Sequence, residues 1–235
     1  MFTQFPMQCL SKSIRLHKPF PLGFRMIRKT SLFNQTSKDL ILAGNFFHSK
    51  GWAPATSGNY SAKVNDKIAI TASGCHKGEL TTDDIIIIDN KANILETAKA
   101  KQRSSAETLI HTLLYNTYPE IGSVLHVHSM HSTIISQLFP THVELKGYEL
   151  LKALPDVSTH DTTIQIPIVE NDQNMVRLAA EIEKKLQITP HPWGLLIRNH
   201  GLYAWGKSIL ATRYLVEAFD FLFETELRLQ TVRQQ

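Results

Sequence analysis

The stretch "VLHVHSMHST" at residues 124–133 carries three histidines within six positions. Side chains alternate between the two faces of a β-strand, so an apolar strand over residues 124–128 would place His126 and His128 on one face. Two adjacent imidazoles in an apolar wall repel each other when charged, and a divalent zinc ion removes that conflict. We therefore predict that His126 and His128 bind zinc. His131 falls in the next predicted helix and is expected to face elsewhere.

A third ligand is needed, because a catalytic zinc ion typically takes three protein ligands and keeps one position open. Eight further histidines are available elsewhere in the chain. Among them His200 stands out, since "RNHGLYAWG" places it at a tight turn between two apolar strands. From such a turn the side chain can project from the sheet edge toward a site. The residue pattern alone leaves His200 open between a ligand and a solvent-exposed turn histidine.

Two short stretches, "TSGN" at residues 56–59 and "TASG" at residues 71–74, have the composition of anion-binding loops. Small hydroxyl residues and glycines let backbone N–H groups approach a phosphate closely. Both stretches flank a hairpin predicted over residues 58–73, so they could converge, although Ser-Gly and Gly-Asn also mark ordinary turns. "SSAE" at residues 104–107 heads a predicted helix, whose N-terminus favours anions. The same residues match a capping box, in which Glu107 would only reach back to the helix start.

The elements that must position these residues alternate along the chain. Apolar periodicity and end signals predict helices over residues 37–50, 105–118, 129–138, 144–154, 174–186 and 209–231, with Ser37 as the first N-cap. Strands are predicted within residues 58–73, 85–89, 124–128, 162–169 and 194–206. The 235 residues suffice for one large domain with a sizeable core. This alternation predicts an α/β protein with layers around a largely antiparallel sheet.

Charge is unevenly distributed along the chain. The first 38 residues hold seven basic side chains and no acidic one, which leaves 18 basic and 21 acidic residues in the remainder. That remainder has no basic stripe of the kind that binds nucleic acid. We interpret residues 1–30 as a disordered extension or an incorrectly assigned start before Met26, with a transit-like leader as the alternative. Residues 31–235 would form a single catalytic domain.

Cysteines and hydropathy narrow the cellular setting. The chain has only two cysteines, too few for a disulfide framework or a cysteine-based zinc site. No apolar run approaches the roughly 20 residues of a membrane-spanning helix. We therefore expect a reducing, cytoplasmic environment and no membrane or nucleic-acid partner.

Taken together, the motifs resemble the class II aldolase and adducin-head family from about residue 37 to the C-terminal helix. The order is "SGN", "TASG", "SSAE", "HVH" nineteen residues after the glutamate, and "RNHG" near the end. "GYELLKAL", "IPIVEN" and "EAFDFLFETELRL" are most similar to a dehydratase branch of that family. The resemblance implies a three-layer α/β/α sandwich with a central, mainly antiparallel sheet, and a homotetramer. It also implies one zinc ion per subunit, held by His126, His128 and His200.

The activity implied by this resemblance is the removal of water from a methylthio-substituted ketose phosphate. The phosphate would be bound by Gly58, Asn59, Ser73, Gly74 and Ser105. The alternatives are a sugar-phosphate aldolase or epimerase of the same family and, more distantly, a non-enzymatic interaction module of the adducin-head type. The latter does not need the three histidines, which argues against it.

Two glutamates are candidates for the catalytic acid/base. The aldolase base maps onto Glu107, whereas the acid/base of the dehydratase branch maps onto Glu149 in "KGYELLKAL". Glu149 is the favoured assignment, and Glu107 would then line the substrate or the metal. The aldolase pattern has two serines directly before the glutamate, but Ala106 stands in the nearer position here, so the expected phosphate contacts there reduce to Ser105 and backbone N–H groups.

Overall fold

The computed structural model describes residues 25–26, 30–190 and 192–233. In this part of the chain ten strands form one sheet, in the order β1-β5-β4-β3-β2-β6-β10-β9-β8-β7. The strands are β1 (Arg25–Met26), β2 (Asn59–Val64), β3 (Lys67–Thr71), β4 (Ile85–Ile88), β5 (Ile94–Thr97), β6 (Ser123–Val127), β7 (His142–Lys146), β8 (Thr163–Val169), β9 (Gly194–Ile197) and β10 (Gly201–Gly206). Only the β1–β5 and β8–β9 pairs are parallel. The predicted, mainly antiparallel sheet is confirmed.

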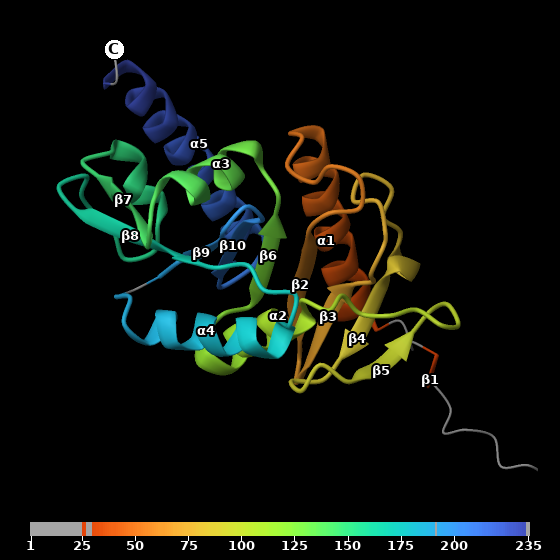
Figure 1. Cartoon of the computed structure of the whole chain (residues 1–235). Coiled ribbons are helices and arrows are strands. Elements are labelled where there is room, and N and C mark those ends of the chain that lie inside the picture. The colour runs from red at the N-terminus through yellow and green to blue at the C-terminus, as the bar shows by residue number, and fades with distance from the viewer. Residues whose placement is uncertain (1–24, 27–29, 191, 234–235) are drawn as a thin grey trace, which may run out of the picture.

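Helices cover both faces of this sheet (Figure 1). On one face lie α1 (Ser31–Ser49), α3 (Met130–Leu138) and α5 (Ile209–Arg233), and on the other lie α2 (Thr108–Thr117) and α4 (Met175–Gln187). Two 3-10 turns, η1 (Thr82–Asp84) and η2 (Glu149–Ala153), complete the described elements. This is the three-layer α/β/α arrangement expected from the family resemblance.

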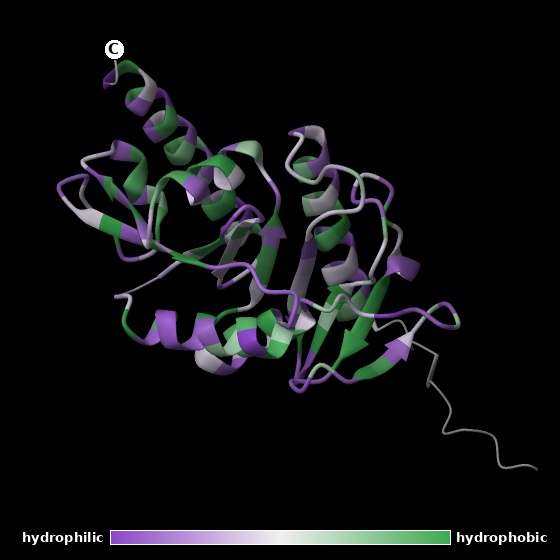
Figure 2. Ribbon diagram, viewed as in Figure 1, coloured by the Kyte–Doolittle hydropathy of each residue, from purple (hydrophilic) through white to green (hydrophobic). Residues whose placement is uncertain are grey.

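The two helix layers create two apolar cores, one on each face of the sheet. Hydrophobic residues dominate the strands between the helices (Figure 2). The run "IIII" of β4 is buried throughout because its side chains alternate between the cores. Ile85 and Ile87 pack into one core, and Ile86 and Ile88 pack into the other. A strand covered on both faces is expected to be apolar at every position.

The middle of the sheet sets the geometry of the site. β6 lies between β2 and β10, and His126 faces Asn59 on one neighbour and Tyr203 on the other. The β2–β3 hairpin turns at residues 65–66, where Asn65 adopts a left-handed conformation with φ 57°, as asparagine tolerates in such turns. The start of β2 and the turn between β9 and β10 therefore meet at the same end of β6.

The single helix predicted over residues 144–154 is wrong in its first part, and only η2 within it is helical, as a short 3-10 turn. β7 occupies residues 142–146, pairs antiparallel with β8, and buries Val143 and Leu145 while the residues between them face outward. This period of two was misread as helical because a short strand followed by a short turn can mimic helical spacing. Gly147, with φ 74°, separates β7 from η2.

Two predicted helix starts are also corrected. α1 begins at Ser31 with Thr30 as its N-cap, whose hydroxyl accepts a hydrogen bond from the Phe33 amide at 3.2 Å, and Ser37 is buried within the helix. α2 begins at Thr108, after the "SSAE" segment.

The predicted N-terminal extension, residues 1–30, is described at Arg25, Met26 and Thr30, and Arg25 and Met26 pair with β5. The remaining residues of the extension, for which disorder was predicted, lie outside the described residues. No helix in the described ranges is long and apolar enough to cross a membrane.

Candidate active site

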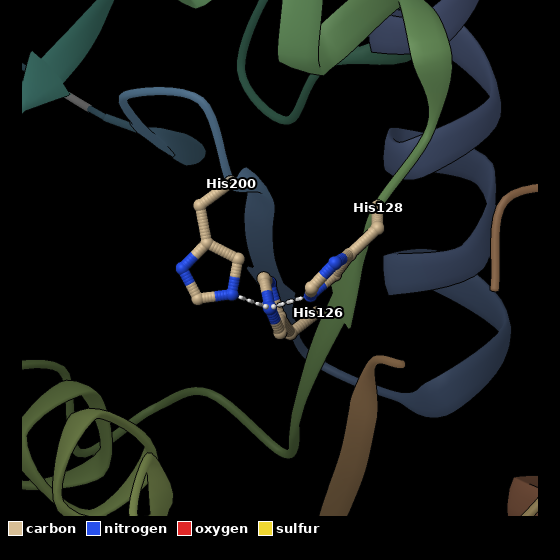
Figure 3. A group of neighbouring side chains, drawn as sticks. All are labelled: His126, His128 and His200. Carbon is tan, nitrogen blue, oxygen red and sulfur yellow. Dashed lines mark hydrogen bonds between the residues drawn. The ribbon is translucent and has the colours of Figure 1, made fainter. Parts of the chain in front are cut away.

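Three histidines converge at the end of β6 (Figure 3). His126 lies on β6, His128 follows the strand, and His200 stands in the turn between β9 and β10. Their ligand-capable nitrogens all lie within 4.8 Å of one another. The Nε2 atom of His126 is 2.9 Å from Nε2 of His128 and 3.3 Å from Nε2 of His200. His131 is outside this group and places Nδ1 3.0 Å from the Asp220 carboxylate of α5.

Close packing of backbone brings His200 to the other two histidines. The preceding residue, Asn199, has φ 56°, which makes the turn tight. A Cβ atom on the following Gly201 would lie 2.1 Å from the carbonyl oxygen of Val127. Only glycine therefore allows β10 to lie this close to the end of β6. The sequence "NHG" predicted a turn. In the structure this turn lies against the end of β6, the strand that carries His126.

The histidine tautomers favour a bound cation. Nδ1 of His126 donates to the carbonyl oxygen of Leu202 at 3.0 Å, so the neutral ring presents the Nε2 lone pair to the centre of the group. Burial lowers the pKa of His126 well below its usual value, and burial together with the nearby His200 lowers the pKa of His128 to about 4. The Nε2 atoms of His128 and His200 lie 2.9 and 3.3 Å from Nε2 of His126, so the three rings direct their nitrogens to one point. The donor set fits a metal ion such as zinc.

Glu107 extends its carboxylate to this histidine group. Oε1 lies 3.1 Å from Nε2 of His200, and Oε2 lies 3.6 Å from Nε2 of His126. The predicted capping box is therefore wrong, because the side chain of Glu107 turns into the site and does not reach back along its own helix. Asn59 Nδ2 and the Tyr203 hydroxyl donate to Oε2 at 2.5 and 3.2 Å. Burial raises the pKa of Glu107, but the hydrogen bonds from His200 and Asn59 and the electrostatic interaction with the histidine group outweigh burial and hold it well below its usual range.

A buried polar chain behind Glu107 was not predicted from the sequence. His111 donates from Nε2 to Asn59 Oδ1, and its Nδ1 accepts from the Ser61 hydroxyl at 2.7 Å. The Tyr115 hydroxyl lies 2.9 Å from the same oxygen of Ser61. Burial lowers the pKa of His111 to about 4, so the ring is neutral and has a single N–H to donate. His111 thereby orients the Asn59 amide toward Glu107. The sequence signal for this link is the spacing, because residues four positions apart at the start of a helix lie on the same face.

All five predicted phosphate-binding residues line one cavity of about 260 Å³. They are Gly58, Asn59, Ser73, Gly74 and Ser105. Glu107 and His128 line the same cavity, so it adjoins the histidine group. Gly58 and Gly74 both have φ 77°, a conformation that favours glycine. The structure brings these residues together as expected, and phosphate binding by them stays a prediction.

Lys77 also lines this cavity, and its side chain is 1% exposed. Nothing in "HKGEL" separates a buried lysine from the more usual solvent-exposed one, so Lys77 was not among the predicted site residues.

Glu149 lies apart from the three histidines of the same chain. It opens η2, its side chain is 70% exposed, and it lies beside Lys152 and His160. It lines a separate, largely apolar groove with Tyr214 and Phe221 of α5. One chain by itself therefore does not bring Glu149 to the three histidines.

Comparison with known proteins identifies the family and the fold. The profile of the class II aldolase and adducin N-terminal domain matches residues 38–227. A methylthioribulose-1-phosphate dehydratase of Pseudomonas fluorescens (strain Pf0-1) is 46% identical over 200 residues, which span 84% of this chain and 95% of that protein. The same-named protein of Marinobacter nauticus (strain ATCC 700491 / DSM 11845 / VT8) is 43% identical over 201 residues, with 84% and 95% covered. The structure of an L-fuculose 1-phosphate aldolase, 20% identical, superposes with a TM-score of 0.71 over 87% of this chain and 89% of that one.

Proposed function

The chain belongs to the class II aldolase and adducin N-terminal domain family, and on that basis we propose that it dehydrates 5-methylthioribulose 1-phosphate. The product is 5-methylthio-2,3-diketopentyl 1-phosphate, an intermediate of the methionine salvage pathway, and the enzyme is a hydro-lyase. One observation carries this proposal: the cavity that gathers the predicted phosphate-binding residues also contains Glu107 and His128. A phosphate and the reacting carbons of one small sugar can therefore lie side by side there. The names and identities of the dehydratase relatives support the choice of reaction.

The proposed cofactor is one zinc ion per subunit, held by His126, His128 and His200. When bound, zinc supplies a Lewis acid that stabilises negative charge developing on the substrate oxygens, which contributes several kcal/mol in comparable sites. The carbonyl of Leu202 keeps the His126 ring in the tautomer that such binding requires.

The reaction needs a group that moves protons at C3 and C4 of the sugar. Removal of the C3 proton, next to the C2 ketone, and departure of the C4 hydroxyl as water leave an enol that converts to the 2,3-diketone. We assign both proton transfers to Glu149, which accepts the C3 proton as a carboxylate and returns it to the departing hydroxyl. In the single chain a hydrogen bond with Lys152 lowers the pKa of Glu149. Glu107 lines the substrate beside the metal ligands.

Since Glu149 lies apart from the histidines of its own chain, the proposal requires a neighbouring subunit to supply it. We accordingly propose a homotetramer in which Glu149 of one copy enters the histidine site of the next. The groove beside Glu149 supports this assembly, because large apolar side chains there face solvent in the single chain. Tyr214 is 51% exposed and Phe221 is 57% exposed, and solvent-exposed apolar clusters of this kind typically mark protein–protein contacts.

A sugar-phosphate aldolase is the second candidate, favoured by the place of Glu107 at the histidine group. In that reaction a base would deprotonate the C4 hydroxyl, and the bond between C3 and C4 would break. The two reactions share the metal and the phosphate cavity, and they differ in which glutamate acts as the base.

The test is to incubate the zinc-loaded protein with 5-methylthioribulose 1-phosphate and to follow products by ultraviolet absorbance and mass spectrometry. Wild type, Glu149→Gln and Glu107→Gln are compared, with zinc content measured for each. Loss of one water by wild type, and its near-abolition in Glu149→Gln with zinc retained, is the expected result. Carbon–carbon cleavage products would establish the aldolase instead. Loss of water by Glu149→Gln beside an inactive Glu107→Gln would assign the base to Glu107.

A further inference from the structure

We propose that Lys77 supplies the positive charge that binds the phosphate of the substrate, and that it thereby selects phosphorylated over unphosphorylated ketoses. The inference rests on the proposed function for the identity of the ligand. Its evidence comes from the cavity itself, where Lys77 lies among the loops that were predicted to bind phosphate.

Lys77 is buried without a hydrogen-bonded counter-ion. Its Nζ atom donates to the carbonyl oxygens of Thr56 at 2.9 Å and Cys75 at 2.7 Å, and both acceptors are neutral. An ammonium group has three N–H donors, so one donor remains. Lysine is seldom buried unless it is paired, because an unpaired buried charge is costly. An anion in the adjoining cavity would satisfy both the third donor and the charge.

The other residues around the cavity cannot provide this charge. Among the residues that line it in the described part of the chain, Lys77 is the single lysine or arginine. Glu107 is an acidic side chain and would repel a phosphate dianion, and the Nε2 atom of His128 is turned toward the other histidines, 2.9 Å from Nε2 of His126. Hydroxyl and backbone N–H groups can donate hydrogen bonds but carry no net charge. Lys77 is therefore the one basic side chain in the described lining that can offset the charge of the phosphate and its repulsion from Glu107, beside the charge of the proposed zinc ion.

The position of Lys77 also suits recognition of a defined anion. One of its two carbonyl acceptors, Thr56, lies in the first predicted anion loop. The other, Cys75, directly follows the second loop. The ammonium group is thus held at the junction of both loops, unlike a solvent-exposed lysine that samples many positions. It interacts electrostatically with Glu107 and His128. A phosphate bound by Lys77 would consequently lie next to the metal ligands.

A purely structural role, in which Lys77 only ties the two loops together, has to be separated from anion binding. Lys77→Met removes the charge and the donors, whereas Lys77→Gln removes the charge but keeps an amide that can donate to carbonyl oxygens. Lys99→Met is the matched control, because Lys99 is an exposed lysine near the same loop, paired with Asp84 at 2.6 Å and outside the cavity.

The experiment is calorimetric titration of the zinc-loaded protein with two probes, inorganic phosphate and unphosphorylated 5-methylthioribulose. Zinc content and Tm are measured for every variant. We expect both Lys77 variants to bind phosphate about tenfold to hundredfold more weakly, the range for loss of a charge-assisted hydrogen bond. Affinity for the uncharged ketose, zinc content and the behaviour of Lys99→Met should match wild type.

Three results would overturn the assignment. Wild-type phosphate affinity in Lys77→Met or in Lys77→Gln would show that the charge is not needed. An equal loss of affinity for both probes, or loss of zinc, would give Lys77 a structural role. Failure of the proposed function is distinguishable, because a wild type that binds phosphate through Lys77 but releases no water from 5-methylthioribulose 1-phosphate would refute the dehydratase alone.

Discussion

Two inactive variants of this chain should restore each other's activity when they share a tetramer. Each proposed active site takes its three histidines from one subunit and Glu149 from the neighbouring subunit. Glu149→Gln removes the acid/base and leaves the histidines intact, while His128→Gln removes a metal ligand and leaves Glu149 intact. Each variant alone should lose activity by about a hundredfold or more, as expected for loss of an acid/base or of a metal ligand.

The magnitude of the recovery follows from how one site is composed. In tetramers assembled at random from equal amounts of both variants, half of the subunits carry intact histidines, and half of their neighbours carry intact Glu149. About one quarter of the sites are then complete, so the mixture should reach about one quarter of wild-type activity. If each subunit used its own Glu149, no subunit of the mixture would hold a complete site, and activity would stay at the level of the parents.

The assay co-expresses the two variants with different affinity tags and isolates hybrids on both tags in succession. Native mass spectrometry establishes their subunit composition, and release of water from 5-methylthioribulose 1-phosphate gives the rate. Wild type carrying the same two tags provides the reference. Hybrids of the correct composition that remain as inactive as their parents would refute delivery of Glu149 across a subunit contact.

Other perturbations test the metal, the packing and the buried polar chain. Removal of the metal by a chelator should abolish activity and lower Tm, because an ion bound only by the folded state stabilises that state. Added zinc should restore both. Unchanged Tm and activity would contradict the proposed metal site. Gly201→Ala should lower the free energy of unfolding in urea by about 1–3 kcal/mol, since the new Cβ would lie 2.1 Å from the Val127 carbonyl oxygen; wild-type stability would show that β10 can shift freely. Burial lowers the pKa of His111 from 6.5 to about 4, so the unfolded chain takes up the proton first as the pH falls. The contribution of neutral His111 to stability is complete above pH 6.5 and is lost toward pH 4. The loss should amount to about 2 kcal/mol between pH 7 and pH 5. Urea unfolding of wild type and His111→Asn at both pH values measures this, and an equal pH dependence of the two proteins would contradict it.

Much of the architecture was readable from local patterns. The alternation of apolar residues predicted the β2–β3 hairpin, the run "IIII" marked β4, and the spacing of His126 and His128 placed both on one strand end. These features depend on residues that are neighbours along the chain, and strand periodicity is a property of the chain's own geometry. The same holds for the glycine-rich loops, whose left-handed turns require residues without a Cβ atom.

Where local patterns compete, the sequence was misleading. Residues 144–154 were expected to be helical, but pairing with β8 made the first part a strand. Glu107 matched a capping box, yet its carboxylate joins the histidine group, because Asn59 and Tyr203 on other elements offer it stronger partners than its own helix end. Both outcomes were decided by contacts that no window of sequence contains.

The composition of the site was likewise decided by the tertiary structure. His126 and His200 are 74 residues apart in the chain and meet because β6 pairs with β10. Lys77 is a cavity residue only because both anion loops close over its side chain, and Glu149 is remote from the histidines because η2 packs against α5. The sequence by itself determined which residue types could bind a metal and a phosphate. Strand order determined which of them meet, because side chains distant in sequence become neighbours only through the pairing of the strands that carry them.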